Sequence, residues 1–243
     1  MTDVNRLPSR VGRNYIQAAV ASRGVEALIL AARPDYHSIV THFLGDALTA
    51  EWPSAKTNGA SAAVTVATSF LTCTSGTDSE GYAGQGYGLF WKGDNGVYMY
   101  SAQTIDTITT SKIEIGLTDS TADAGAVDTK ATPTATADDF CVLVRDTADN
   151  TQLDNISAID TVVTANKENI YTVVGGTYFV TEFRHQNDAV ATFLNGQDAG
   201  RGSMQGGDLC TPWFFCQART TSSRVLTVDY LYCIGPNGAS VPW

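Results

Sequence analysis

The sequence is poor in positive charge, in histidine and in long apolar runs, and each shortage excludes a class of protein. Fifteen lysines and arginines oppose 25 aspartates and glutamates, for a net charge of −10, so we expect no nucleic-acid partner. Three scattered histidines and five cysteines without C-x-x-C spacing argue against a structural zinc site. Arg23 and Glu26 interrupt the most apolar segment, so no membrane-spanning helix is predicted.

The common catalytic motifs are also missing. Neither G-x-S-x-G nor H-E-x-x-H occurs in the chain. The glycine-rich stretch from Gly81 to Gly88 is followed by Leu-Phe-Trp rather than by a helix start, so it is interpreted as a loop and strand entry and not as a phosphate cradle.

What the chain does contain is the material of β-strands and tight turns. Threonine, valine, tyrosine and phenylalanine are spread through the sequence after residue 60, as strands require. Asn-Gly pairs, which favour turns, recur at 58–59, 95–96, 195–196 and 237–238. No 20- to 50-residue period repeats, which argues against solenoids and propellers. The sequence therefore predicts an all-β domain.

The closing strand gives the clearest pattern. Two alternating sets of side chains are predicted to face opposite sides, Leu226, Val228, Tyr230, Tyr232 and Ile234 against Val225, Thr227, Asp229, Leu231 and Cys233. Before it lie an apolar strand at 211–218 and a hairpin whose turn is Asn195-Gly196.

This order resembles the C-terminal half of the concanavalin A-like lectin/glucanase jelly roll, the laminin-G-like sandwich. The residues that carry the resemblance are Phe193-Leu194-Asn195-Gly196 and Leu226-Thr227-Val228-Asp229-Tyr230-Leu231, with Phe43 to Leu48 and Glu51-Trp52 matching the opening of the family. The resemblance covers roughly residues 41 to 236 and implies an antiparallel jelly-roll sandwich. It implies a fold more strongly than an activity.

The first 33 residues differ in charge from the rest. Five arginines, Arg6, Arg10, Arg13, Arg23 and Arg33, oppose only Asp3 and Glu26, which gives this segment a formal charge of +3. Residues 14–32 are predicted to be helical, with Pro34 marking the end. We interpret residues 1–40 as an attachment arm and 41–243 as the sandwich. The alternative is that the helix packs across one face or end of the sandwich.

The cysteines are interpreted mainly as small buried hydrophobes. Cys73, Cys141, Cys216 and Cys233 lie in apolar strand contexts. A disulfide from Cys210 to Cys216 is the alternative. Free cysteines agree with assembly in a reducing cytoplasm.

The family resemblance also raises glycoside hydrolysis, which requires two carboxylates on one face of a strand. Glu114 is followed on its own face by Gly116 and Thr118. Glu182 is followed by Arg184, and Asp229 is flanked at two-residue steps by Thr227 and Leu231. No pair is present, so the prediction is a protein that is not an enzyme, with no catalytic residue and no organic cofactor.

Two acidic loops could hold calcium. One runs from Asp119 to Asp123 with Asp128, and the other contains Asp146, Asp149 and Asp154, but neither follows D-x-D-x-D-G spacing. They are interpreted as solvated acidic turns; if an ion binds, the second loop is the expected place. Glycan contacts are predicted at Trp91, Trp213 and His185, with Tyr98 and Tyr100 as further platform residues; the alternative is that these side chains fill the core.

The Ala/Thr/Gly/Asp-rich style of residues 113–128 resembles structural proteins of tailed-bacteriophage virions that use lectin-like jelly rolls. That resemblance implies a capsid decoration or cement protein, assembled in the bacterial host cytoplasm. The arm, through Arg6, Arg10, Arg13 and Arg23, would bind the major capsid protein or another virion protein. A homo-oligomer such as a trimer is expected, with Trp243 packed into a neighbour. The alternative is a glycan-binding adhesion module on a head fibre or tail, with a host surface glycan as ligand.

Overall fold

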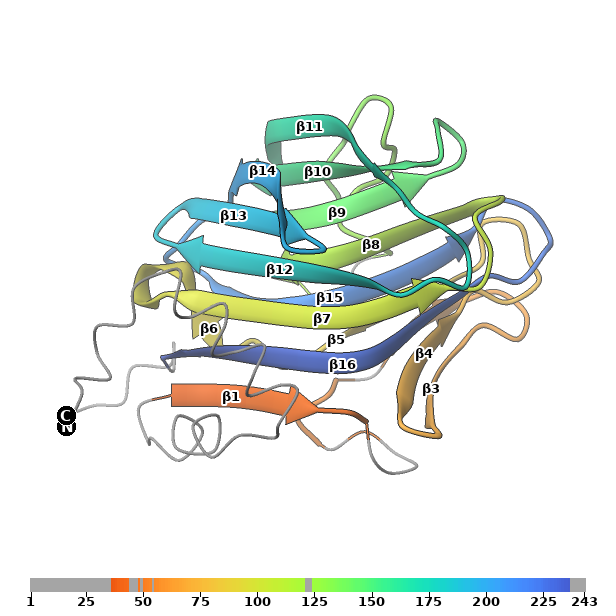
Figure 1. Cartoon of the computed structure of the whole chain (residues 1–243), viewed down its shortest axis with the longest axis horizontal. Helices are drawn as coiled ribbons and strands as arrows, with labels where there is room; N and C mark the ends of the chain where they lie inside the picture. Colours follow the sequence, from red (N-terminus) through yellow and green to blue (C-terminus); the bar gives the residue numbers. More distant parts are fainter. Residues whose placement is uncertain (1–35, 44–47, 49, 54, 121–123, 237–243) are drawn as a thin grey trace.

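The computed structural model describes residues 36–43, 48, 50–53, 55–120 and 124–236. They form a sandwich of two antiparallel sheets, with sheet A in front of strands β15 and β5 of sheet B in Figure 1. Residues 1–35 of the predicted arm, with its arginines and its helix, and Trp243 lie outside these residues. Within the described part, no helix is long and apolar enough to cross a membrane.

Sheet A has eight strands in the order β14-β13-β12-β7-β16-β4-β3, with β1 paired to β16. Their bounds are β1 Tyr36–Thr41, β3 Ala63–Ala67, β4 Phe70–Thr74, β7 Val97–Ile105, β12 Phe179–Gln186, β13 Ala189–Leu194, β14 Gln197–Ser203 and β16 Val225–Pro236.

Sheet B runs β11-β10-β9-β8-β15-β5-β2, with β6 paired to β15. Its strands are β2 Lys56–Asn58, β5 Tyr82–Gly86, β6 Trp91–Lys92, β8 Ser111–Thr118, β9 Phe140–Asp146, β10 Gln152–Ile159, β11 Val162–Thr172 and β15 Leu209–Ala218. A short 3₁₀ turn, η2 Gly93–Asn95, precedes β7.

The main core lies between the two sheets, where every second side chain of a strand points inward and packs against those of the other sheet. On β7 the odd positions from Val97 to Ile105 are buried and the even positions are half-buried, as expected for a strand with one face outward. Strands β8 and β9 are buried at every position instead. Sheet B is therefore covered on both faces, and its outer face carries a second apolar cluster.

Strand β16 corrects the predicted alternation. The pairing with β7 skips Asp229, so that Val228 is opposite Gln103 and Tyr230 is opposite Ala102. This one-residue β-bulge reverses the faces beyond it. Leu231 and Cys233 join Leu226 and Val228 in the main core, whereas Tyr230, Tyr232 and Ile234 form a separate cluster on the outer face of sheet A. The prediction that the two leucine–valine positions share a face with the tyrosines was wrong.

The hairpin prediction is confirmed. Strands β13 and β14 are joined by Asn195 and Gly196, whose φ values of 49° and 78° match a two-residue turn with both residues left-handed. The Asn195 side chain accepts a hydrogen bond from the backbone N–H of Val180 at 2.8 Å, which fixes the turn against β12.

Strand β1 places both ends of the described chain together. Tyr36 is opposite Pro236 in the antiparallel pair β1–β16. The first and the last described residues therefore lie side by side at one end of the sandwich. Residues 36–40, which the sequence assigned to the arm, lie in this strand of sheet A.

All five cysteines are buried and unbridged. Cys210 and Cys216 lie on the same strand, six residues apart, which separates their Cα atoms by roughly 20 Å. A disulfide needs Cα atoms within about 7 Å, so the predicted alternative of a bond between them was wrong. Burial raises the pKa of the Cys73 and Cys141 thiols to about 12.

Candidate functional site

The outer face of sheet B is closed by a segment of the chain between β8 and β9. This cover segment, residues 124–139, folds on itself through a bridge between Val127 and Ala135. Its Ala126, Val127 and Ala137 pack on apolar side chains of the sheet, namely Phe140, Val142, Val144, Ile156, Ala158, Trp213 and Phe215.

Glu114 is the first anchor of the cover segment. Its carboxylate accepts hydrogen bonds from the backbone N–H groups of Ala126 at 2.6 Å and Val127 at 3.2 Å. It also accepts one from Trp213 Nε1 at 3.1 Å and pairs with Lys112 Nζ at 2.8 Å. With four donors around a fully buried carboxylate, Glu114 is saturated and out of reach of a ligand in this structure.

The same face offers Glu114 no carboxylate partner along its strand. Lys112 precedes it and Gly116 follows it at two-residue steps, and both are buried. The Lys112 ammonium lies 5.2 Å from the centre of the Phe215 ring and donates to the carbonyl of Val127. The group is a buried ion pair that holds the cover segment to the sheet.

Lys130 is the second anchor. Its ammonium, fully buried, points from the cover segment into a cage of oxygens in and beside the loop between β9 and β10. It lies 2.5 Å from Asn150 Oδ1 and 3.1 Å from the carbonyl of Gln152. Asp149 Oδ2 and Asp154 Oδ1 follow at 3.3 and 3.4 Å. A lysine of the chain itself thus stands among the oxygens that a cation would use.

The predicted calcium ligands are divided between two chain cations. Asp149 and Asp154 face Lys130, whereas Asp146 pairs with Arg219, which also contacts Glu80. No group of three or more His, Cys, Asp or Glu side chains suited to a metal occurs in the described residues. Calcium binding remains a prediction, and the other loop includes residues outside the described part.

An acidic group lies at the end of sheet B where β8 stops. Burial, with a smaller contribution from the nearby Asp139 and Asp138, raises the pKa of Asp119 to about 6. Burial and Asp208 also raise the pKa of Asp139, which accepts a hydrogen bond from the backbone N–H of Asp160. Carboxylates this close disfavour one another's ionisation.

The outer face of sheet A is different, because it carries a ladder of aromatic and charged side chains. Three rows cross strands β12, β7 and β16: Arg184–Tyr98–Ile234, Glu182–Tyr100–Tyr232 and Val180–Ala102–Tyr230. Tyr98 meets Tyr232 and Tyr100 meets Tyr230 edge-on, with ring centroids 5.9 and 6.3 Å apart. His42 lies 4.5 Å from the Tyr230 ring.

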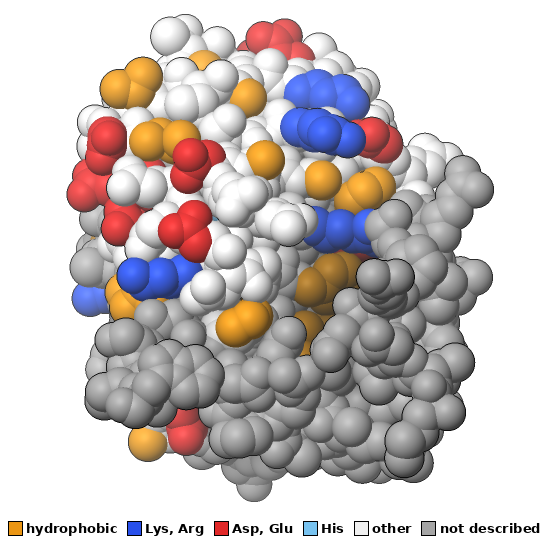
Figure 2. Space-filling model, turned by 90° about the vertical axis from the view of Figure 1, so that its left-hand side faces the viewer, with side chains coloured by type: hydrophobic (Ala, Val, Ile, Leu, Met, Phe, Trp, Pro, Cys, Tyr) orange, Lys and Arg blue, Asp and Glu red, His pale blue; other side chains and the backbone are white. Residues whose placement is uncertain are grey.

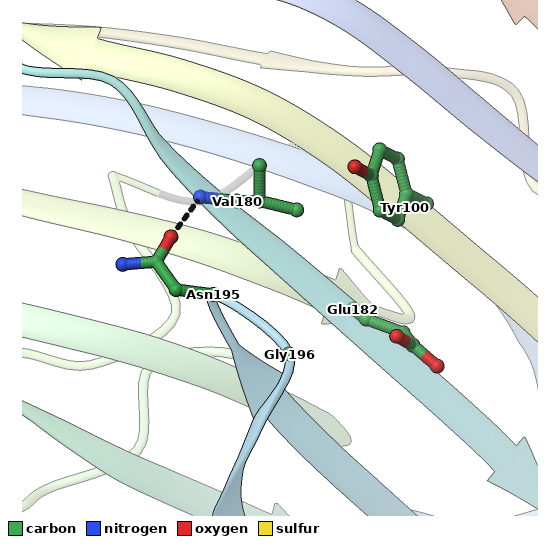
Figure 3. A pocket seen from close by; sticks show the side chains of 5 residues that line it. All are labelled: Tyr100, Val180, Glu182, Asn195 and Gly196. Atoms are coloured by element: carbon green, nitrogen blue, oxygen red, sulfur yellow. Dashed lines mark hydrogen bonds between the residues drawn. The ribbon is translucent and has the colours of Figure 1, made fainter. Parts of the chain in front are cut away.

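A hollow of about 280 Å³ opens on this face beside the β13–β14 turn (Figure 3). It is lined by Tyr100, Val180, Glu182, Asn195 and Gly196. Tyr100 and Glu182 stand opposite each other on neighbouring strands, and Asn195 closes one side through its bond to Val180.

Glu182 and Arg184 form an ion pair next to the hollow. Arg184 Nε lies 2.6 Å from Glu182 Oε1, and its Nη2 contacts the same oxygen. The guanidinium lies 4.8 Å from the centre of the Phe193 ring and 5.9 Å from that of Tyr98. Burial first and Glu182 second raise the pKa of Tyr100, so its hydroxyl keeps its proton across the physiological range.

The three side chains predicted as glycan contacts are all buried. Trp91 donates from Nε1 to the carbonyl of His37 at the rim, and Trp213 lies beneath the cover segment. His185 points inward, its Nε2 3.1 Å from the carbonyl of Met204. Tyr98 and Tyr100 are the platform residues that do reach the outer face. The sequence offers Glu182 no second acid two residues away; what the structure adds is its place opposite Tyr100 on a paired strand, where both line the hollow.

The described part of one end of the sandwich carries charged and hydrophobic side chains together. Figure 2 shows the end of the sandwich on the left of Figure 1, where acidic, basic and hydrophobic side chains are interspersed.

Comparison with known proteins identifies the fold. No family model and no curated protein matches the sequence. A prokaryotic β-1,3-1,4-glucanase (lichenase) from a mouse hindgut metagenome matches with TM-score 0.56 and 10% identity, over 83% of this chain and 99% of that one. The carbohydrate recognition domain of Emp47p matches with TM-score 0.56 and 7% identity, over 84% and 96%. The chain has a concanavalin A-like jelly-roll fold.

A β-glucanase of Bacillus licheniformis matches similarly, with TM-score 0.55 and 9% identity over 80% of this chain and 96% of that one. The fold and sandwich predictions are thus confirmed. Glycan-cleaving enzymes and carbohydrate recognition domains both share this fold, so the fold alone does not separate enzyme from lectin.

Proposed function

We propose that this protein is a non-catalytic carbohydrate-binding module whose site is the hollow on the outer face of sheet A. The observation that carries the proposal is the meeting, in one open depression, of an aromatic ring, a carboxylate and a side-chain amide, from Tyr100, Glu182 and Asn195. Sugars present both C–H faces and hydroxyl groups, and sites of this mixed character bind them. The shared fold with carbohydrate recognition domains supports the same class of ligand.

We propose no catalytic step because Glu182 has no second carboxylate beside it in the hollow. Glu182 is followed on its strand by Arg184, with which it pairs, and the residues opposite it on β7 and β13 are Tyr100 and Phe193. Glycoside hydrolysis uses two carboxyl groups about 5 to 10 Å apart across the scissile bond. Among the described residues that line the hollow, Glu182 is the one acid.

The test is binding of the full chain to a glycan array, repeated with Tyr100→Ala. We expect a defined set of glycans to be bound and the variant to lose them, with its circular dichroism unchanged. A reducing-end assay on each bound glycan should detect no cleavage. Binding that survives Tyr100→Ala would place the site elsewhere, and release of reducing ends would overturn the non-catalytic assignment.

The capsid decoration role is our second proposal, in which the module is attached to a virion through residues 1–40. It draws support from one observation: Tyr36 and Pro236, the first and last described residues, are paired side by side at one end of the sandwich. The test is co-pelleting with assembled capsids of the full chain and of a variant lacking residues 1–33. Pelleting of the full chain alone supports attachment by the arm, whereas equal behaviour of the two contradicts it.

A further inference from the structure

The hollow should distinguish between neutral and charged sugars, because one of the described residues that line it, Glu182, carries a negative charge. Arg184 lies beside it on β12, and its contacts from Nε and Nη2 both fall on Glu182 Oε1. The guanidinium is also packed against the rings of Phe193 and Tyr98. Its charge and two of its nitrogens, Nε and Nη2, are therefore engaged by Glu182.

Glu182 keeps one oxygen for a ligand. Because Arg184 converges on Oε1, Oε2 is the oxygen that a hydroxyl group entering the hollow would meet. A carboxylate accepts from hydroxyl groups in short, charge-assisted hydrogen bonds, and it accepts only. The same oxygen would repel a ligand carboxylate, a repulsion that the net charge of −10 on the chain reinforces.

The remaining groups complete the donor and acceptor pattern. Asn195 Oδ1 is occupied by the Val180 N–H at 2.8 Å, and Nδ2 points away from Tyr100 and Glu182, so Asn195 bounds the hollow rather than donating into it (Figure 3). The Tyr100 hydroxyl, which keeps its proton, both donates and accepts. The Tyr100 ring and the Val180 side chain supply apolar walls for a C–H face.

We propose, resting on the carbohydrate-binding function above, that the hollow selects neutral sugars and rejects acidic ones, with Glu182 Oε2 accepting from one or two ring hydroxyl groups. At about 280 Å³, the hollow is just below the roughly 300–1,000 Å³ of sites that enclose drug-sized ligands, so it holds one sugar residue rather than an extended chain. Single-residue sites bind weakly and gain from repeated presentation.

The experiment is ligand-observed NMR of the full chain with two panels, neutral hexoses and N-acetylhexosamines on one side and hexuronic acids on the other. We expect the neutral panel to bind and the acidic panel not to bind. Glu182→Gln should weaken neutral binding at least about tenfold, the usual loss for a charge-assisted hydrogen bond. It should also create uronate binding, because Arg184 is then uncompensated.

Glu168→Gln is the matched control, since Glu168 is an exposed acid on β11 of the other sheet and its loss changes net charge equally. It should leave both panels unchanged. Tyr100→Phe, which keeps the ring and removes the hydroxyl, should reduce neutral binding without creating uronate binding. Thermal melts of each variant establish that the fold is retained.

The outcomes distinguish failure of the carbohydrate-binding function from failure of the selectivity for neutral sugars. If neither panel nor the glycan array shows binding, the carbohydrate-binding function itself is overturned. If uronates bind the native chain, or if neutral binding is indifferent to Glu182→Gln, the function stands and the selectivity for neutral sugars through Glu182 is overturned.

Discussion

Each outer face of the sandwich carries a glutamate on a central strand, flanked by aromatic rings and paired with a cation two residues away. On sheet B, Glu114 meets Lys112, Trp213 and two backbone N–H groups beneath the cover segment. On sheet A, Glu182 meets Arg184 through one oxygen and lines an open hollow. The same ingredients give a structural anchor where every hydrogen-bonding group is satisfied, and a recognition site where some are left for a ligand.

The largest expected effect comes from breaking the anchor on sheet B. Glu114→Ala leaves Lys112 buried without its partner, and removing one member of a buried ion pair typically costs about 3–5 kcal/mol. Urea unfolding should show this loss. Glu182 is itself buried, but its loss leaves Arg184 27% exposed and in reach of water, so Glu182→Ala should cost less, about 1–2 kcal/mol. Equal losses would mean that the two faces do not differ as described.

Lys130→Met tests the second anchor. The variant leaves Asp154 and part of Asp149 without a counter-charge, and we expect a loss of about 3 kcal/mol in the free energy of unfolding. Millimolar calcium should then restore part of that stability in the variant, because four clustered oxygens lose their ammonium partner and a cation can replace it. The native chain should not respond at this loop. A variant that ignores calcium would show that the cage fits only an ammonium group.

A matched pair of aromatic substitutions compares the stability of the two outer faces with smaller changes. Trp213→Phe removes a donor to buried Glu114 and leaves space under the cover segment, so we expect a loss of about 2 kcal/mol. Tyr100→Phe on the open face should change stability by less than about 0.5 kcal/mol. Chemical denaturation of both variants checks the order, and a Tyr100→Phe loss as large as that of Trp213→Phe would contradict it.

The smallest effect concerns pH at the end of sheet B. The pKa of Asp119 is raised to about 6 in the folded chain, mainly by burial, above its ordinary value of 3.8. The folded state therefore binds the proton more tightly, and the associated stability is present below about pH 4 and lost as pH rises through 6. Asp119→Asn should be favoured over the native chain increasingly across this window. Melting temperatures of both chains from pH 4 to 7 measure it; a constant difference would contradict the assignment.

Much of the fold follows from local sequence. The Asn195-Gly196 turn was predictable because few residues other than asparagine and glycine adopt two successive left-handed conformations. The apolar runs of β15 and β16 likewise identify strands. The faces of β16 were not predictable beyond Asp229, because a bulge leaves no mark in a period-two pattern until the partner strand is known.

The site was predicted less well, for a related reason. Trp91 and Trp213 are large and aromatic, but the segments that bury them come from far along the chain: β1 for the first and the cover segment for the second. Tyr98 and Tyr100 were proposed among several platform residues, and their pairing with Glu182 depends on the β7–β12 register. A signal was present in the alternation of Glu182 and Arg184 on one face of an apolar strand, since such a strand rarely carries two charges without use.

The bulge at Asp229 makes this one position of strand β16 tolerant of changes in both chemistry and length. Asp229 itself is a partly exposed residue, and most substitutions there should be tolerated. Its deletion should also be tolerated, because removing the extra residue restores plain alternation: Val228 stays inward, Tyr230 stays outward and Leu231 stays inward. A change of length at this one place should therefore leave both the core and the outer tyrosine face intact and alter only the local bend and twist of β16.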